Sequence, residues 1–87
     1  MSAPKIEIYT KWGCGYCSRA KALLDSKGVA YEEYDVTMGG PKKAEMLERV
    51  PDARTVPQIF IGGEPVGGSD DLQALEQSGQ LDSLLGR

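Results

Sequence analysis

Cys14 and Cys17 are separated by two residues and are the only cysteines in the chain. They follow an apolar stretch typical of a strand and begin an amphipathic stretch typical of a helix. The positive end of a helix dipole stabilises a thiolate, which is the nucleophilic form of cysteine. Two thiols at this spacing can also form a disulfide with each other. We therefore interpret the pair as a thiol–disulfide redox motif.

The alternatives for this pair are buried packing residues or half of a metal site. Packing predicts apolar neighbours, whereas residues 11–16 are rich in turn-forming, polar and aromatic types. Two cysteines fall short of the four ligands of a structural zinc site within one monomer. The chain has no histidine, which removes the usual metal ligand and the usual base of a cysteine–histidine catalytic pair.

The composition is that of a small globular protein. The 87 residues have room for one hydrophobic core, so we predict a single domain over residues 1–87. A net charge of −3 argues against general nucleic-acid binding, which requires a basic surface. No apolar run approaches the ~20 residues of a transmembrane helix, and residues 1–5 lack the features of a secretory signal. We therefore expect a cytoplasmic protein with neither a nucleic-acid partner nor a membrane partner.

Hydrophobic periodicity and turn residues predict the element order βαβαββα with a short helix at the end. Gly28 is expected to end the first helix, and Pro41 is expected to begin the second. Ser69 is expected to be the N-cap of the third, with Asp70 and Asp71 in its first turn. The predicted ranges are strand 5–10, helix 17–27, strand 29–36, helix 41–50, strand 57–61, strand 64–66, helix 69–78 and helix 81–85.

This order predicts an α/β fold with a four-stranded mixed sheet flanked by helices. The first strand, helix and strand form a parallel unit with a right-handed crossover, and the last two strands form a hairpin. Ligands of open α/β sheets bind beyond the carboxyl ends of the parallel strands. Cys14 follows the first strand at that end, so the position and the chemistry of the motif predict the same site.

Three separated motifs resemble those of bacterial dithiol glutaredoxins. They are YTK at 9–11 before CGYC at 14–17, then TVPQIFI at 55–61, then GGSDDL at 67–72. The resemblance covers nearly the whole chain and implies a thioredoxin-like fold. It implies a glutathione-dependent oxidoreductase that reduces protein disulfides and glutathione mixed disulfides. The implied partners are glutathione and disulfide-containing or glutathionylated proteins, and the implied state is mostly monomeric.

The resemblance also implies a division of roles between the two cysteines. Cys14 is expected to attack the sulfur of a mixed disulfide as a thiolate. Cys17, one turn deeper, is expected to be the resolving thiol when a protein disulfide is reduced. Cys14 alone is expected to suffice for glutathione mixed disulfides. Because the chain lacks histidine, the amides of the first helical turn and the charge of Lys11 are expected to stabilise the thiolate.

A glutathione site is implied by the second motif and its surroundings. Val56 is expected to pair its backbone with the cysteinyl part of glutathione, with Thr55 beside it. Pro57 is expected to be cis and to face the cysteines, the alternative being an ordinary proline at a strand start. Lys11 is expected to bind the glycyl carboxylate, and Tyr16 is expected to flank the cleft.

The third motif is expected to bind the other end of glutathione. Gly68 and Ser69 open a helix, whose free N–H groups suit the γ-glutamyl carboxylate. Asp70 is expected to accept the ammonium group of the same moiety. The alternative for this segment is a plain capped helix with acidic residues in its first turn.

Gly15 departs from the family pattern, since many members carry proline there. Family active sites without that proline are the ones that hold a [2Fe–2S] cluster between two monomers, through one cysteine each and two glutathione thiols. Four thiolates are the right number for such a cluster. The resemblance therefore implies an alternative function as a cluster-bridged homodimer, a sensor or store with Cys14 as ligand. A thioredoxin-like reductant and a non-catalytic interaction module are the remaining alternatives.

Overall fold

The computed structural model describes residues 4–86 as a sheet of four strands with four helices around it. The elements are, in chain order, β1 (Ile6–Thr10), α1 (Gly15–Ser26), β2 (Glu32–Asp35), α2 (Pro41–Arg49), β3 (Gln58–Ile61), β4 (Glu64–Gly67), α3 (Ser69–Gln77) and α4 (Gln80–Leu84). The predicted order of elements is confirmed. Within residues 4–86, no helix combines the length and the apolar character needed to cross a membrane.

The bounds of the elements differ from the predicted ranges by a few residues. α1 begins at Gly15, two residues before its predicted start. β2 covers only four residues of the predicted strand over 29–36, because its parallel pairing with β1 extends only from Glu32 to Asp35. Gly28 adopts φ +69°, in the left-handed region that favours glycine after a helix, which confirms it as the stop signal of α1. Pro41 begins α2 as predicted.

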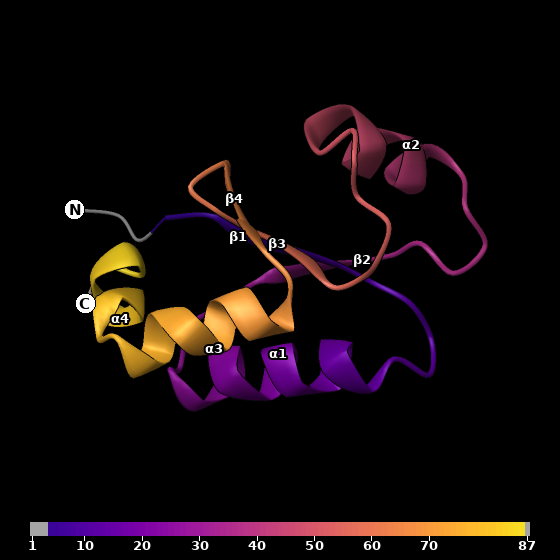
Figure 1. The fold of residues 1–87 in the computed structure, drawn as a ribbon. Helices are drawn as coiled ribbons and strands as arrows, with labels where there is room; N and C mark the ends of the chain where they lie inside the picture. Colours follow the sequence, from indigo (N-terminus) through magenta and orange to yellow (C-terminus); the bar gives the residue numbers. More distant parts are fainter. Residues whose placement is uncertain (1–3, 87) are drawn as a thin grey trace.

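The strands are arranged in the order β2-β1-β3-β4. β1 pairs in parallel with β2, whereas the pairs β1–β3 and β3–β4 are antiparallel, so the sheet is mixed as predicted. The helix α1 connects the two parallel strands and lies against the sheet (Figure 1). The chain therefore leaves the carboxyl end of the central strand β1 just before the cysteine motif.

One face of the sheet carries an apolar core. Figure 1 shows α1 and α3 together on this face, with α2 on the opposite side. The alternation along β1 directs Ile6 and Ile8 into this core, where they join Leu24 of α1 and Leu72 of α3. Burial of each such side chain contributes about 1.5–3 kcal/mol. This core fixes the axis of α1, and with it the position of the cysteine pair.

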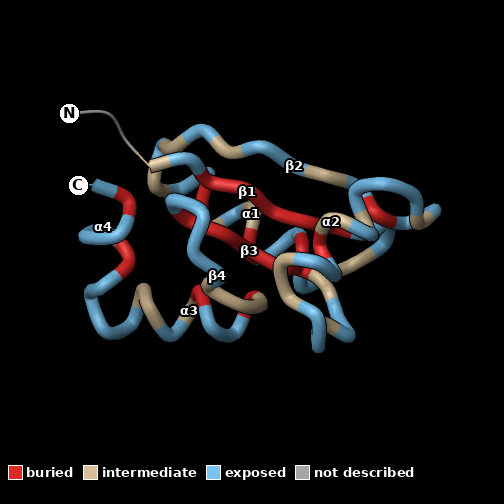
Figure 2. Tube along the Cα trace, turned by 90° about the horizontal axis from the view of Figure 1, so that it is seen from above, coloured by how far each residue is buried: buried red, intermediate tan, exposed pale blue. Residues whose placement is uncertain are grey.

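The opposite face combines aromatic packing with charge. The rings of Tyr9 and Phe60 meet edge to face at 5.7 Å. Glu7 is buried beneath α2, and Arg49 donates to its carboxylate at 2.9 Å. The hydrogen bond from Arg49, assisted by one from Tyr34, holds the pKa of Glu7 below its usual range. Figure 2 shows that the buried residues concentrate in β1 and β3, while the edge strand β2 is largely exposed.

Candidate active site

Cys14 is the N-cap residue of α1. Its backbone is extended, with φ −93° and ψ 110°, and its Sγ accepts the backbone N–H of Cys17 at 3.1 Å. An N-cap side chain normally satisfies one of the free N–H groups of the first helical turn with an oxygen, and here a sulfur takes that place. Gly13 supports this start, because its φ of +75° turns the chain between β1 and α1 in a conformation that favours glycine.

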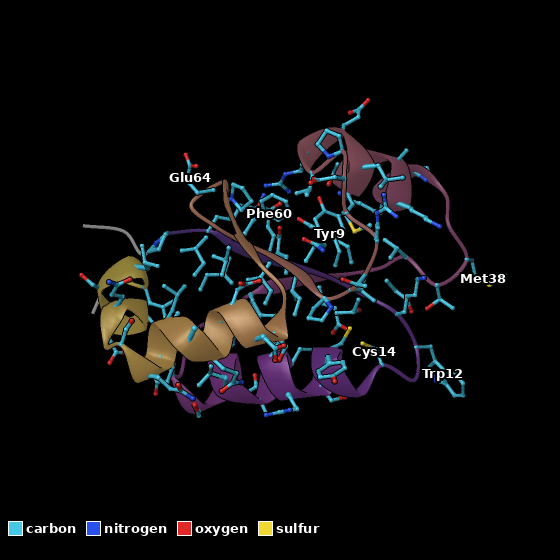
Figure 3. The ribbon with its side chains drawn as sticks, viewed as in Figure 1. Tyr9, Trp12, Cys14, Met38, Phe60 and Glu64 are labelled. Atoms are coloured by element: carbon cyan, nitrogen blue, oxygen red, sulfur yellow. The ribbon has the colours of Figure 1, made fainter. Side chains whose placement is uncertain are left out.

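The two thiols have opposite surroundings on one helical turn. Both are free, but Cys14 is half-buried, whereas Cys17 is only 2% exposed. Desolvation and the hydrogen bond with Cys14 raise the pKa of Cys17 to about 11. Cys17 therefore keeps its proton at neutral pH. The sulfur of Cys14 lies at the end of the molecule where the β1–α1 loop meets solvent (Figure 3).

A groove lies between the start of α3 and the segment that precedes β3. We call it the α3-side groove; it has a volume of about 470 Å³ and is lined by Tyr16, Thr55, Val56, Pro57, Gln58, Gly67, Gly68, Ser69, Asp70 and Asp71. All the predicted glutathione residues except Lys11 are in this set. The thiol of Cys14 donates to the carbonyl of Val56 at 3.7 Å, which places the sulfur at the edge of the groove. The peptide bond between Val56 and Pro57 is cis.

The start of α3 differs from the sequence expectation. Gly68, and not Ser69, is the N-cap residue, and Ser69 is the first residue of the helix. The reason is that the carboxylate of Asp71 reaches back to accept the backbone N–H of Gly68 at 2.9 Å. Ser69 is 4% exposed, and its hydroxyl has no hydrogen-bond partner among the described residues. Because an unsatisfied buried hydroxyl is costly, this site favours a polar ligand atom within reach of Ser69.

Two further residues shape this groove. Gln58 is nearly buried and donates through Nε2 to the carbonyl of Thr55 at 2.8 Å, which holds the loop before β3. Gly67 adopts φ +114°, and a Cβ at this position would overlap the carboxylate of Asp71. The spacing of Gly68 and Asp71 is a capping signal readable in the sequence. No local signal indicated the role of Gln58.

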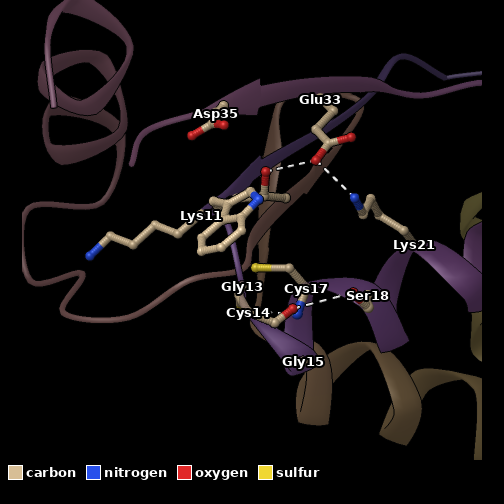
Figure 4. A pocket seen from close by; sticks show the side chains of 11 residues that line it. Lys11, Gly13, Cys14, Gly15, Cys17, Ser18, Lys21, Glu33 and Asp35 are labelled. Atoms are coloured by element: carbon tan, nitrogen blue, oxygen red, sulfur yellow. Dashed lines mark hydrogen bonds and ion pairs between the residues drawn. The ribbon is translucent and has the colours of Figure 1, made fainter. Parts of the chain in front are cut away.

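A second groove lies on the other side of Cys14. We call it the β2-side groove; it is lined by Thr10, Lys11, Trp12, Gly13, Cys14, Gly15, Cys17, Ser18, Lys21, Glu33 and Asp35. The carboxylate of Glu33 accepts from Thr10 Oγ1 at 2.8 Å and from Lys21 Nζ at 3.0 Å (Figure 4). The hydrogen bond from Lys21, followed by that from Thr10, lowers the pKa of Glu33. This charged cluster was not predicted from the sequence.

Lys11 lies apart from the other predicted glutathione residues. Its exposed side chain extends away from both cysteines (Figure 4). Lys11 lines the β2-side groove and also a smaller neighbouring groove that contains Lys43 and Arg54. No described hydrogen bond or ion pair joins the Lys11 side chain to Cys14. The amide of Cys17 is therefore the observed donor to the Cys14 sulfur.

Comparison with known proteins gives consistent matches over the chain. The sequence model of the family described as Glutaredoxin matches residues 6–66. Glutaredoxin 3 of Escherichia coli strain K12 is 52% identical over 80 residues, which is 92% of this chain and 95% of that protein. The solution structure of glutaredoxin from Brucella melitensis has a TM-score of 0.83 and 53% identity, covering 98% of this chain and 91% of that one. The crystal structure of the buckwheat glutaredoxin–glutathione complex has a TM-score of 0.83 and 32% identity, covering 95% of this chain and 77% of that one.

Proposed function

The chain belongs to the glutaredoxin family, and from this premise we propose the roles of its two cysteines and of the α3-side groove. It has the thioredoxin-like fold of its structural neighbours. It is a glutathione-dependent thiol–disulfide oxidoreductase with glutathione as reductant. The N-cap position of the Cys14 sulfur is the observation that carries our assignment of the nucleophile.

The reduction of a protein disulfide takes two exchange steps on this site. The Cys14 thiolate attacks one sulfur of the substrate, forms a mixed disulfide with it and releases the other sulfur as a thiolate. Cys17 then gives up its proton and attacks the Cys14 sulfur, which forms the Cys14–Cys17 disulfide and releases the second substrate thiolate. The substrate gains two electrons, and the pair of cysteines loses two. The 3.1 Å hydrogen bond from the Cys17 amide favours the thiolate of Cys14 both as attacking and as leaving group.

Glutathione returns the enzyme to the dithiol. One glutathione thiolate attacks the Cys14 sulfur and releases Cys17 as a thiolate, which takes up a proton. A second glutathione thiolate attacks the glutathione sulfur of the resulting mixed disulfide, which releases Cys14 and yields glutathione disulfide. A glutathionylated protein reacts with the reduced enzyme by a shorter route. Cys14 attacks the glutathione sulfur, releases the protein thiolate and forms the same mixed disulfide between Cys14 and glutathione. That route does not require Cys17.

We place glutathione in the α3-side groove. The backbone of Val56 lies beside the Cys14 sulfur, so it is in reach of the cysteinyl part, with Thr55, Pro57 and Tyr16 around it. The start of α3 supplies free N–H groups for the γ-glutamyl carboxylate.

Two side chains at that end of the groove complete the proposed contacts. The buried and unpartnered hydroxyl of Ser69 supports a ligand at the start of α3. The exposed Asp70 suits the ammonium group of the γ-glutamyl moiety. We also propose that Lys11 binds the glycyl carboxylate. This contact requires its side chain to turn towards Cys14, because it extends away from both cysteines in the structure (Figure 4).

The alternatives are not favoured by these findings. The matching family and the named relatives are glutaredoxins, which favours glutathione over a flavoprotein as the source of electrons. No observation favours a cluster-bridged dimer as the main role of the chain. We propose that the protein acts as a monomeric single domain in the cytoplasm, where the reducing environment keeps both thiols free.

The proposed function is tested with a coupled assay. The purified protein is supplied with bis(2-hydroxyethyl) disulfide, glutathione, glutathione reductase and NADPH, and NADPH oxidation is followed. We expect turnover that depends on glutathione and is absent when thioredoxin reductase replaces glutathione and its reductase. Turnover only with thioredoxin reductase would contradict the proposal and establish the thioredoxin-like alternative.

A further inference from the structure

The two most exposed large apolar side chains of the described residues lie at the cysteine end of the molecule. Trp12 is 87% exposed and Met38 is 94% exposed. Figure 3 shows both at the end of the molecule that carries Cys14. Large apolar side chains gathered in solvent mark interaction surfaces more often than singly scattered ones do. We call Trp12 and Met38 the apolar rim.

The backbone beneath the apolar rim is held by hydrogen bonds between two loops. The N–H of Trp12 donates to the hydroxyl of Thr37 at 2.7 Å, which joins the β1–α1 loop to the β2–α2 loop. The N–H of Thr37 in turn donates to the carboxylate of Asp35 at 2.7 Å. Val36 also donates to the carbonyl of Thr10 at 2.8 Å. Trp12 and Met38 therefore extend from two loops that are hydrogen-bonded to each other.

The apolar rim adjoins the side of Cys14 that glutathione leaves free. Trp12 lines the β2-side groove together with Cys14, whereas the proposed glutathione residues line the α3-side groove. When glutathione occupies the α3-side groove, the polypeptide half of a mixed disulfide has to lie outside that groove, and the β2-side groove is the other hollow next to Cys14. Trp12 lines that groove, and its N–H joins it to the loop that carries Met38 through the hydrogen bond to Thr37.

We propose that the apolar rim binds the polypeptide half of the substrate and selects substrates with an aliphatic or aromatic side chain next to the oxidised cysteine. This inference rests on the proposed function, since it assumes that glutathione lies in the α3-side groove. The continuity of the rim with the reactive sulfur favours a polypeptide substrate as the occupant. Covering roughly 55 Å² of apolar surface corresponds to about a tenfold gain in kcat/KM.

The test uses two synthetic hexapeptides that each carry one glutathionylated cysteine. One has leucine on both sides of the cysteine, and the other has serine. We expect the native protein to reduce the leucine peptide with a kcat/KM about tenfold higher than for the serine peptide. The double variant Trp12→Ser with Met38→Ser is expected to lose this preference and to keep native turnover of bis(2-hydroxyethyl) disulfide.

A matched control separates the rim from general surface hydrophobicity. Leu84 is 45% exposed on α4, at the end of the molecule away from Cys14, and Leu84→Ser is expected to keep the tenfold preference. Equal kcat/KM values for the two peptides in the native protein would overturn the inference, as would a preference that survives in the double variant. Native protein that self-associates through the rim, with a dimer mass lost in the double variant, would also overturn it.

The outcome for the inference can be told apart from the outcome for the proposed function. Native protein without turnover of bis(2-hydroxyethyl) disulfide would refute the proposed function before any peptide is compared. Native turnover of this small disulfide together with equal rates for both peptides would refute the apolar rim alone. Circular dichroism of each variant checks folding, and the exposure of Trp12 and Met38 predicts native spectra.

Discussion

Cys14 and Cys17 share one turn of α1, and yet their sulfurs differ in burial and in hydrogen bonding. Cys14 lies where the helix begins, accepts an amide N–H and borders two grooves. Cys17 is 2% exposed, and its pKa is raised to about 11. A separation of three residues is enough to place one sulfur at the helix end and the other in the interior. On the proposed mechanism, the same short motif supplies a nucleophile and a second thiol that stays protonated at neutral pH.

Burial and helix geometry therefore give two identical side chains different surroundings within one helical turn. The chain has no histidine, so a neighbouring imidazole takes no part in activating Cys14. The N-cap position supplies the hydrogen bond to its sulfur. For Cys17, desolvation is the largest cause of the raised pKa, so the thiol is protonated at neutral pH.

The largest effect is expected from Cys14→Ser. A hydroxyl at this position is a far weaker nucleophile than a thiolate, so reduction of both protein disulfides and glutathione mixed disulfides should fall to the uncatalysed rate. The coupled assay measures both activities. Ser26→Ala, at the exposed far end of α1 and outside both grooves, serves as the control and should keep native turnover. Retained activity in Cys14→Ser would remove Cys14 from the role of nucleophile.

Cys17→Ser is expected to abolish only one of the two activities. Reduction of a protein disulfide should stop at the mixed disulfide with Cys14, because no second thiol is present to release the substrate. Turnover of glutathione mixed disulfides should stay within about threefold of the native rate. The comparison uses insulin as the protein disulfide and glutathionylated peptide as the mixed disulfide. Loss of both activities would show that the division of roles is wrong.

The reactivity of Cys17 towards iodoacetamide should depend steeply on pH. With a pKa of about 11, its thiolate fraction rises about a thousandfold between pH 7 and pH 10. Peptide mapping by mass spectrometry in the Cys14→Ser background should therefore show slow labelling at pH 7 and fast labelling at pH 10. The hydrogen bond with Cys14 is absent in that background, but desolvation is the larger cause of the raised pKa. Equally fast labelling at pH 7 and pH 10 would contradict the raised pKa of Cys17.

The same shift predicts a change in stability. Because the pKa of Cys17 is raised by folding from about 9 to about 11, folding favours the protonated thiol. This contribution to the free energy of unfolding is fully present below pH 9 and is lost as the pH rises through 11. Urea unfolding of the reduced native protein and of Cys17→Ser at pH 8 and pH 11 checks this, and an equal loss in both proteins would contradict it.

The smallest effect is expected at the far end of the α3-side groove. Asp70→Asn removes the negative charge that is proposed to face the ammonium group of glutathione. An exposed ion pair contributes about 0.2–1 kcal/mol, so the KM for glutathione should rise about threefold with kcat unchanged. Asp52→Asn changes an exposed aspartate outside both grooves and should leave KM unchanged. An unaltered KM in Asp70→Asn would remove Asp70 from the glutathione site.

Much of the fold and the position of the cysteine pair could be predicted from local sequence signals. The alternation in β1, the helical spacing in α1 and the glycine stop at Gly28 are properties of neighbouring residues, and the structure confirms them. The position of Cys14 followed from the rule on the carboxyl ends of parallel strands. The convergence of Val56 and Ser69 on one groove followed from the family resemblance.

Two features that differ from or go beyond the sequence expectation have different causes, one distant in the sequence and one local. Glu7 and Arg49 are 42 residues apart, and nothing near either one predicts that they pair across the sheet and α2. The N-cap of α3 was placed at Ser69 because serine is a favoured cap, but the Asp71 carboxylate made Gly68 the cap instead. The tertiary arrangement decides the pairing of Glu7 with Arg49, whereas the cap at Gly68 is decided by a residue only three positions along the chain.

We propose that Cys14 carries glutathione in the α3-side groove and that the β2-side groove stays open. The most direct measurement is NMR spectroscopy of the Cys17→Ser protein after reaction with glutathione disulfide. We expect one glutathione per chain, bound to Cys14, with nuclear Overhauser effects from glutathione to Val56 and to the backbone amides of Ser69 and Asp70. Effects to Trp12 and Glu33 in place of these would contradict the account, because they would put glutathione in the opposite groove.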